Sequence, residues 1–165
     1  MDVNNKDNLN DITNNNIQTL ILQAKEFEKQ EKFEEAEEYY RKAVNIDVNN
    51  KEPWIELALY LRREGELTKW TVCCEKIREI HPNETSFLLD LASIYKIYSK
   101  NDKAEDCYKQ LIRVNPKDKD AIELLFGLCR KEYCFLEKDA LRKILIWFPG
   151  NEYLEERLRK LLEYD

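Results

Sequence analysis

The chain has 165 residues, 43% of them hydrophobic and 36% charged, with a formal net charge of −6. It contains only 3 Gly and 4 Pro, too few for the turns of a β-sandwich, so we expect one all-α domain. The net negative charge argues against nucleic acid as the main partner, because such binding needs a clustered positive field.

The first sixteen residues are rich in Asn and Asp and show no sustained apolar periodicity. Such a composition is typical of a disordered leader, so residues 1–16 are predicted to be disordered and structure to begin near Ile17. The sequence has no signal-peptide core and no apolar run of membrane-spanning length, and its five Cys show no CxxC spacing. We therefore expect a cytoplasmic protein with reduced thiols and no membrane partner.

Two later stretches resemble each other: KFEEAEEYYRKAVNIDVNN, from Lys32, and KNDKAEDCYKQLIRVNPKD, from Lys100. They lie 68 residues apart, and a step of half that length reveals a third copy between them. Three sets of residues recur in register with a period of 34: Ala24, Ala58 and Ala92; Leu20, Trp54 and Leu88; Phe27, Leu61 and Tyr95. The chain is therefore built from repeats.

Each repeat predicts two antiparallel helices. In the second repeat the first helix carries apolar residues at helical spacing from Trp54 to Leu61, and the second helix does so from Trp70 to Ile77. A proline such as Pro116 ends the second helix. Because one helix pair cannot bury its apolar face alone, the pairs are expected to stack.

This 34-residue pattern resembles the tetratricopeptide repeat (TPR). The resemblance implies an α-α superhelix, the TPR solenoid, with repeats over residues 17–50, 51–84, 85–117 and 118–150, the last of them degraded. Residues 151–165 form an apolar stripe with charged residues elsewhere, which predicts a C-terminal capping helix. The chain is interpreted as a complete small protein, with a fragment of a longer one as the alternative.

The second repeat departs from its neighbours at two places. Trp70 stands where the flanking repeats have Ala36 and Ala104, and Cys74 stands where they have Tyr40 and Tyr108. The two exchanges run in opposite directions one helical turn apart, so their volumes compensate. This pattern predicts a core that is packed differently rather than a functional tryptophan site.

Residues that could support catalysis are sparse. His81 is the only histidine and has no partners in a catalytic or metal-binding pattern. Cys129 and Cys134 are interpreted as reduced structural thiols, with a redox pair as the less favoured alternative. No phosphate-binding glycine loop or hydrolase motif occurs. We therefore expect no enzyme activity, no cofactor and no metal.

In TPR proteins the first helices line the concave side of the stack, so the resemblance implies a concave partner-binding groove on their non-core face. Stepping by 34 residues along this outer, non-core face of the first helices gives apolar candidates flanked by polar and basic ones: Ile21, Ile55 and Leu89; Lys25, Leu59 and Ser93; Arg62 and Lys96; Arg63 and Ile97. A merely solvated helix face is the alternative for any single charged residue. We expect a scaffold that binds a peptide or helix of another protein, apolar and acidic in character.

TPR modules that bind the chaperone EEVD C-terminus hold its carboxylates with lysine, asparagine and arginine at defined places of three successive first helices. Those places here carry Ile21, Lys25, Glu56, Ser86 and Asp90. Only Lys25 is cationic, so the sequence argues against this ligand. A small dedicated chaperone, like the type III secretion class II chaperones, is the alternative function. An RNA-binding repeat is disfavoured because Glu28, Glu56 and Asp90 interrupt the basic residues, and self-association remains open.

Overall fold

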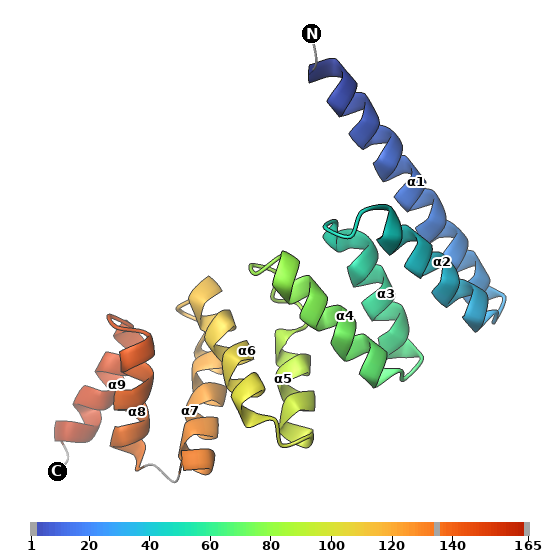
Figure 1. Cartoon of the computed structure of the whole chain (residues 1–165). Coiled ribbons are helices and arrows are strands. Elements are labelled where there is room, and N and C mark those ends of the chain that lie inside the picture. The colour runs from blue at the N-terminus through green and yellow to red at the C-terminus, as the bar shows by residue number, and fades with distance from the viewer. Residues whose placement is uncertain (1–2, 134–135, 164–165) are drawn as a thin grey trace. The chain divides into compact units, whose positions relative to one another are not determined.

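Every regular element in the described part of the chain is an α-helix, which confirms the all-α prediction. The computed structural model describes residues 3–133 and 136–163. Its helices, labelled in Figure 1, are α1 (Val3–Lys29), α2 (Phe33–Ile46), α3 (Lys51–Arg63), α4 (Leu67–Ile80), α5 (Leu88–Ile97), α6 (Asn101–Val114), α7 (Lys119–Tyr133), α8 (Glu137–Trp147) and α9 (Glu152–Glu163).

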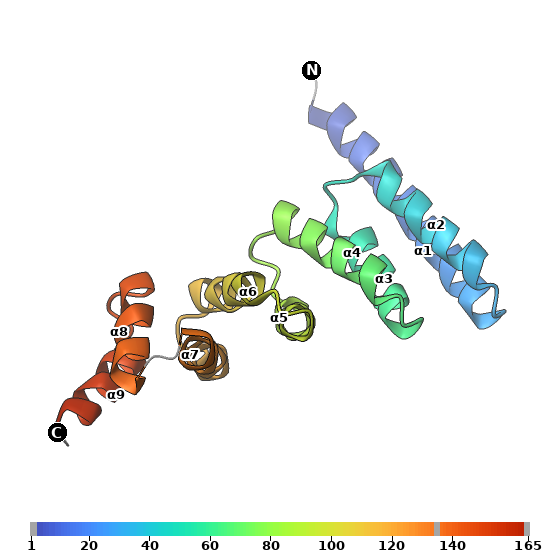
Figure 2. The same ribbon diagram turned by 60° about the horizontal axis from the view of Figure 1, so that its bottom comes forward.

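The helices form two compact units, where length alone predicted one domain. The N-terminal unit, residues 1–82, contains α1 to α4, and the C-terminal unit, residues 83–165, contains α5 to α9. In the N-terminal unit α1 packs against α2, α3 against α4 and α2 against α3, and the α1–α2 pair lies side by side in Figure 1 and Figure 2. In the C-terminal unit each helix from α5 to α9 packs against the next. Packing between sequence neighbours is the arrangement of a helical repeat.

The turn inside each of the first three helix pairs repeats with the sequence period. Glu31, Gly65 and Ser99, spaced 34 residues apart, all adopt positive φ, at 58°, 75° and 55°. The next residue in each turn donates its backbone N–H to the carbonyl of Phe27, Leu61 or Tyr95, closing the first helix. Because these turns share one geometry, equivalent residues of successive first helices fall on equivalent faces.

Helix α1 begins at Val3 and so occupies most of the segment predicted to be a disordered leader. Residues 3–29 contain neither Gly nor Pro, so no residue interrupts the helical hydrogen bonds. Apolar packing nevertheless begins where the periodicity does, since Ile17 is buried while Ile12 is 52% exposed. Ile17 therefore marks the start of the core rather than the start of the helix.

The exchanged residues of the second repeat lie in the core of the N-terminal unit. Trp70 and Cys74 on α4 are buried, as are Ala36 and Tyr40 at the matching places of α2. Ala104 and Tyr108 occupy the same places in α6 and are buried too. In α4 a large residue is thus followed one turn later by a small one, whereas in α2 and α6 a small residue is followed by a large one.

We expect Trp70→Ala to lower the free energy of unfolding by about 3–5 kcal/mol, because it opens a cavity that Cys74 is too small to fill. The double variant Trp70→Ala/Cys74→Tyr restores the order found in α2 and should recover part of this loss. Urea unfolding of the full chain, followed by circular dichroism, measures both effects.

Val72→Ala is the matched control on the same helix, since Val72 is 59% exposed. It should change stability by no more than about 0.5 kcal/mol. A double variant no more stable than Trp70→Ala alone would show that the two exchanges do not compensate each other.

Candidate partner-binding surfaces

The N-terminal unit places most of its predicted binding residues on the outer sides of α1 and α3. Leu59 is 36% exposed, Arg62 and Arg63 are exposed, and Ile55 is half-buried. Ile21, at 3% exposure, belongs to the core instead. Helix α1 packs against α3 as well as α2, and this second contact was not visible in the helical periodicity.

Two predicted binding cations of this unit form ion pairs between the first helices. Lys25 Nζ on α1 lies 2.9 Å from Glu56 Oε1 on α3, and Arg63 Nη2 on α3 lies 2.6 Å from Glu28 Oε2 on α1. Glu28 also accepts a hydrogen bond from the hydroxyl of Tyr40, whose pKa is raised well above its ordinary value by burial and by this carboxylate. Lys25 and Arg63 therefore join α1 to α3.

In the C-terminal unit the four predicted residues lie on one exposed stripe of α5. Leu89 is 45% exposed and Ile97 is 78% exposed, and Ser93 and Lys96 between them are exposed as well. The spacing of these residues places them on one helix face. Ser93 Oγ donates a hydrogen bond to the carbonyl of Leu89, 2.9 Å away, so its hydroxyl is already used within the helix.

A cavity of about 350 Å³ lies between the end of α5, the turn into α6 and helix α7; we call it the α5–α7 cavity. Its lining combines apolar residues, a helical glycine and charged groups: Lys96, Ser99, Asn101, Glu123, Leu124, Gly127, Leu128 and Lys131. Of these, only Lys96 was predicted to be a binding residue. Of the two leucines in the lining, Leu128 is buried and Leu124 is 38% exposed.

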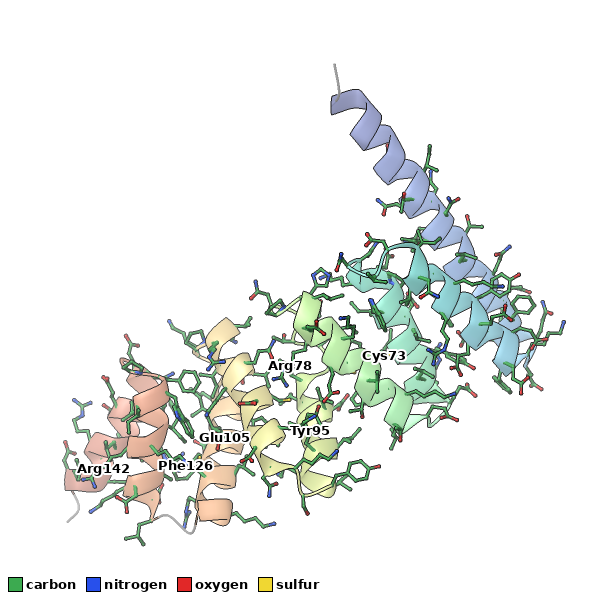
Figure 3. All side chains as sticks on the ribbon, viewed as in Figure 1. Cys73, Arg78, Tyr95, Glu105, Phe126 and Arg142 are labelled. Carbon is green, nitrogen blue, oxygen red and sulfur yellow. The ribbon has the colours of Figure 1, made fainter. Side chains whose placement is uncertain are left out.

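The acidic group of the α5–α7 cavity is held by the C-terminal helix. Glu123 accepts hydrogen bonds from Arg157 and from the hydroxyl of Tyr153, the latter at 2.7 Å. Partial burial raises the pKa of Glu123, but these hydrogen bonds outweigh it and the net pKa lies below its ordinary value. Arg157 also lies 2.8 Å from Glu137 and 4.1 Å from the centre of the Phe126 ring, which Figure 3 labels on α7.

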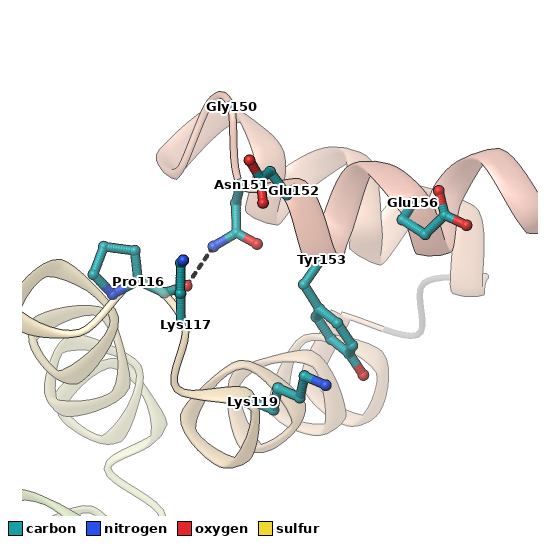
Figure 4. A pocket seen from close by; sticks show the side chains of 8 residues that line it. All are labelled: Pro116, Lys117, Lys119, Gly150, Asn151, Glu152, Tyr153 and Glu156. Carbon is teal, nitrogen blue, oxygen red and sulfur yellow. Dashed lines mark hydrogen bonds between the residues drawn. The ribbon is translucent and has the colours of Figure 1, made fainter.

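A second cavity, of about 640 Å³, lies where the turn before α7 meets the start of α9 (Figure 4). Asn151 spans it, donating from Nδ2 to the carbonyl of Pro116, 2.8 Å away, and accepting from the backbone of Leu154. The lining includes two lysines and two glutamates: Lys117, Lys119, Glu152 and Glu156. Because these charges balance, the cavity has no preference for a ligand of one sign.

The described cysteines and His81 lie where they contribute to the structure of the helix pairs and turns. Cys73, Cys74, Cys107 and Cys129 are buried and are not joined by disulfides in the described residues. Burial raises the pKa of Cys73 and Cys129 to about 11, which disfavours the reactive thiolate. Cys134, the partner considered for Cys129, lies outside the described residues. His81 Nε2 lies 2.7 Å from the carbonyl of Asn49 and so joins two turns of the N-terminal unit.

Neither a metal site nor a membrane span is found in the described ranges. Residues 3–133 and 136–163 contain no group of three His, Cys, Asp or Glu side chains arranged to hold a metal ion. Within the same ranges no helix combines the length and the apolar character needed to cross a membrane.

Comparison with known proteins agrees with this repeat architecture. The family model of the cilia and flagella-associated protein 70 middle TPR-like domain matches residues 20–138. The chain belongs to this TPR family. TPR domains are in general non-enzymatic modules for protein–protein interaction, and the fold indicates such a scaffold here.

Two curated proteins share part of this TPR sequence. Protein CTR9 homolog of Arabidopsis thaliana is 28% identical over 131 residues, covering 78% of this chain and 12% of that protein. Protein O-mannosyl-transferase Tmtc3 of Drosophila melanogaster is 25% identical over 138 residues, covering 79% of this chain and 14% of that protein. The chain thus spans only a small part of the length of each relative.

Solved TPR structures show the same fold at low sequence identity. A tetratricopeptide repeat protein from Parabacteroides merdae is 19% identical with a TM-score of 0.59, covering 90% of this chain and 62% of its own. MamA is 18% identical with a TM-score of 0.57, and the match covers 97% of this chain and 98% of the MamA chain. The first TPR of Spaghetti (RPAP3), bound to the HSP90 peptide SRMEEVD, is 17% identical with a TM-score of 0.54. This match covers 72% of our chain and 94% of the Spaghetti chain.

The lowered pKa of Glu123 predicts a stability that depends on pH. A carboxylate with a lowered pKa in the folded state stabilises the fold above its unfolded pKa, near 4.5, and loses this contribution as the pH falls through the folded value. We expect Glu123→Gln to destabilise the C-terminal unit at pH 7, and this difference from wild type to shrink towards pH 3. Urea unfolding of both proteins across this range measures it.

Glu163→Gln, at the exposed end of α9, is the control and should leave the unfolding midpoint unchanged at either pH. A Glu123→Gln protein as stable as wild type at pH 7 would contradict the stabilising role of the contacts with Arg157 and Tyr153.

Proposed function

We propose that this protein is a non-enzymatic scaffold that binds a peptide or helix of a partner protein on the outer faces of its first helices. The observation that carries the proposal is the stripe on α5, where Leu89 and Ile97 are 45% and 78% exposed on either side of Lys96. Apolar side chains gathered on one exposed face are typical of a binding surface. The alternation of apolar and basic groups suits a partner segment that is apolar and acidic.

The N-terminal unit supports a smaller surface of the same character. Leu59, Ile55 and Arg62 belong to it, while Ile21 is left out because it is buried. Lys25 and Arg63 contribute less charge than the sequence suggested, because Glu56 and Glu28 already neutralise them. Its affinity for a partner should therefore depend more on apolar contact than on charge.

The likeness to an O-mannosyl-transferase is attributed to the repeats alone. It covers 14% of that protein at 25% identity, which is too little to carry a whole enzyme's activity over to this chain. The buried cysteines, which form no disulfide in the described residues, support a reducing compartment such as the cytoplasm as part of this proposal.

Leu59→Asp/Arg62→Glu should weaken or abolish partner binding by the N-terminal unit, because it places negative charge on the proposed surface without touching the core. Affinity capture followed by mass spectrometry, with wild type and variant side by side, measures the loss. Circular dichroism should show an unchanged melting temperature.

Val72→Asp/Lys76→Glu is the matched control, with one exposed apolar residue and one lysine changed on α4, away from the first helices. It should retain every partner. If Leu59→Asp/Arg62→Glu also retains every partner while folded, the surface on α3 is not used. A different result is that wild type and variant recover one client protein in the same amount as each other. That result would favour the dedicated-chaperone alternative, because a client held by many contacts is insensitive to this change.

We also expect that Lys25 of the N-terminal unit does not bind the peptide SRMEEVD, which the first TPR of Spaghetti binds. Glu56, at a place where such modules hold the ligand's carboxylates, instead pairs with Lys25 at 2.9 Å. An incoming carboxylate would meet Glu56 and would have to displace it from Lys25. Isothermal titration calorimetry should give the same result for wild type and Lys25→Ala, whereas saturable binding that Lys25→Ala abolishes would contradict this expectation.

A further inference from the structure

We propose that the α5–α7 cavity is the point at which the C-terminal unit recognises its partner, and that it takes an acidic residue next to a large apolar one. This inference rests on the proposed function and adds the location and the chemistry of the contact. The carboxylate would lie between Lys96 and Lys131, and the apolar side chain would pack against Leu124, Gly127 and Leu128.

Gly127 is the first observation that supports a ligand here. Glycine is unfavourable inside a helix, and α7 continues for six residues beyond it. The usual structural reasons are absent: a Cβ at Gly127 would meet nothing within 4 Å, and among the glycines only Gly65 and Gly150 have the positive φ that favours glycine. None of the described residues therefore packs so closely against Gly127 that a side chain there would be excluded. The missing side chain leaves the helix backbone open on the side of the cavity.

The charges of the cavity give the sign of the ligand. Lys96 approaches from α5 and Lys131 from α7, and neither forms an ion pair with any side chain that the structure describes. Glu123, the only acidic residue in the lining, is engaged by Arg157 and Tyr153. The cavity is thus locally positive in a chain with a formal net charge of −6. A carboxylate can pair with both lysines without meeting an uncompensated negative charge.

The size and the surroundings of the cavity give the shape of the ligand. A volume of about 350 Å³ accommodates one or two side chains rather than a whole folded element. Ile97, 78% exposed, follows Lys96 directly and offers a further apolar contact outside the cavity. An extended segment with an acidic residue flanked by Leu, Ile or Phe fits this order of contacts. The larger cavity in Figure 4 gives no such preference, since its lysines and glutamates balance.

The test begins with a random 12-residue peptide display library selected on the full wild-type chain. Recovered peptides are synthesised with a fluorescein label and titrated by fluorescence anisotropy. We expect Asp or Glu next to a large apolar residue in most recovered peptides, and affinities that fall as salt is raised. Lys96→Glu/Lys131→Glu should weaken binding by about tenfold or more, through loss of attraction and added repulsion.

Gly127→Leu tests the cavity without changing its charge. The added Cβ meets no atom within 4 Å and leucine favours a helix more than glycine does, so the protein should fold with an unchanged or raised melting temperature while binding is weakened by about tenfold. Gly127→Ala should weaken it less. Lys117→Glu/Arg142→Glu is the control for charge, because it makes the same change in net charge on the same unit outside the cavity and should bind as wild type does.

Two results separate this inference from the proposed function. If the recovered peptides are lost with Leu59→Asp/Arg62→Glu but kept by the cavity variants, the scaffold function stands and the cavity inference fails. If no peptide is recovered, both fail. Recovered peptides without acidic enrichment, or binding of polyuridylate RNA that Lys96→Glu/Lys131→Glu abolishes in place of peptide binding, would also overturn the cavity inference.

Discussion

The burial of small residues inside the helix pairs is the constraint on which the rest of the structure depends. Ala24, Ala58 and Ala92, one on each of the first helices α1, α3 and α5, have no exposed surface, and the alanines of α2 and α6 are equally buried. Two helix backbones approach closely only where side chains are this small, and the larger apolar residues then fill the space on either side. Helix α4 meets the same constraint with Trp70 and Cys74, which moves the bulk by one helical turn.

The repeated turn converts this packing into a regular surface. A turn residue of positive φ closes α1, α3 and α5 at intervals of 34 residues, so each second helix returns at a matching point. Glu31 and Ser99 adopt this conformation although it favours glycine, which shows that the turn geometry outweighs the local preference of the residue. With the scaffold fixed in this way, the outer faces of the first helices are free to vary.

Features that depend on the spacing of apolar residues could be predicted from the sequence. Features that depend on contact with a further helix could not. The helix pairs and the exposed stripe from Leu89 to Ile97 follow from spacing alone. Ile21 is buried on a helix that packs against α3 as well as α2, and no period within one helix encodes the contact with α3. The α5–α7 cavity escaped prediction because its lining combines side chains of two successive repeats, which the spacing within one helix does not bring together. The helix before Ile17 escaped because its composition resembles that of disordered segments.

The two units use their charges in opposite ways, and this difference decides what each surface can bind. In the N-terminal unit Glu28 and Glu56 are satisfied by Arg63 and Lys25, cations of the outer face itself, so pairing consumes the positive field there. In the C-terminal unit Glu123 is satisfied by Arg157, which comes from α9 and does not line the α5–α7 cavity. The lysines of that cavity are therefore not needed to balance its carboxylate. A chain with a formal net charge of −6 can thus present a positive site because the balancing cation lies on another helix.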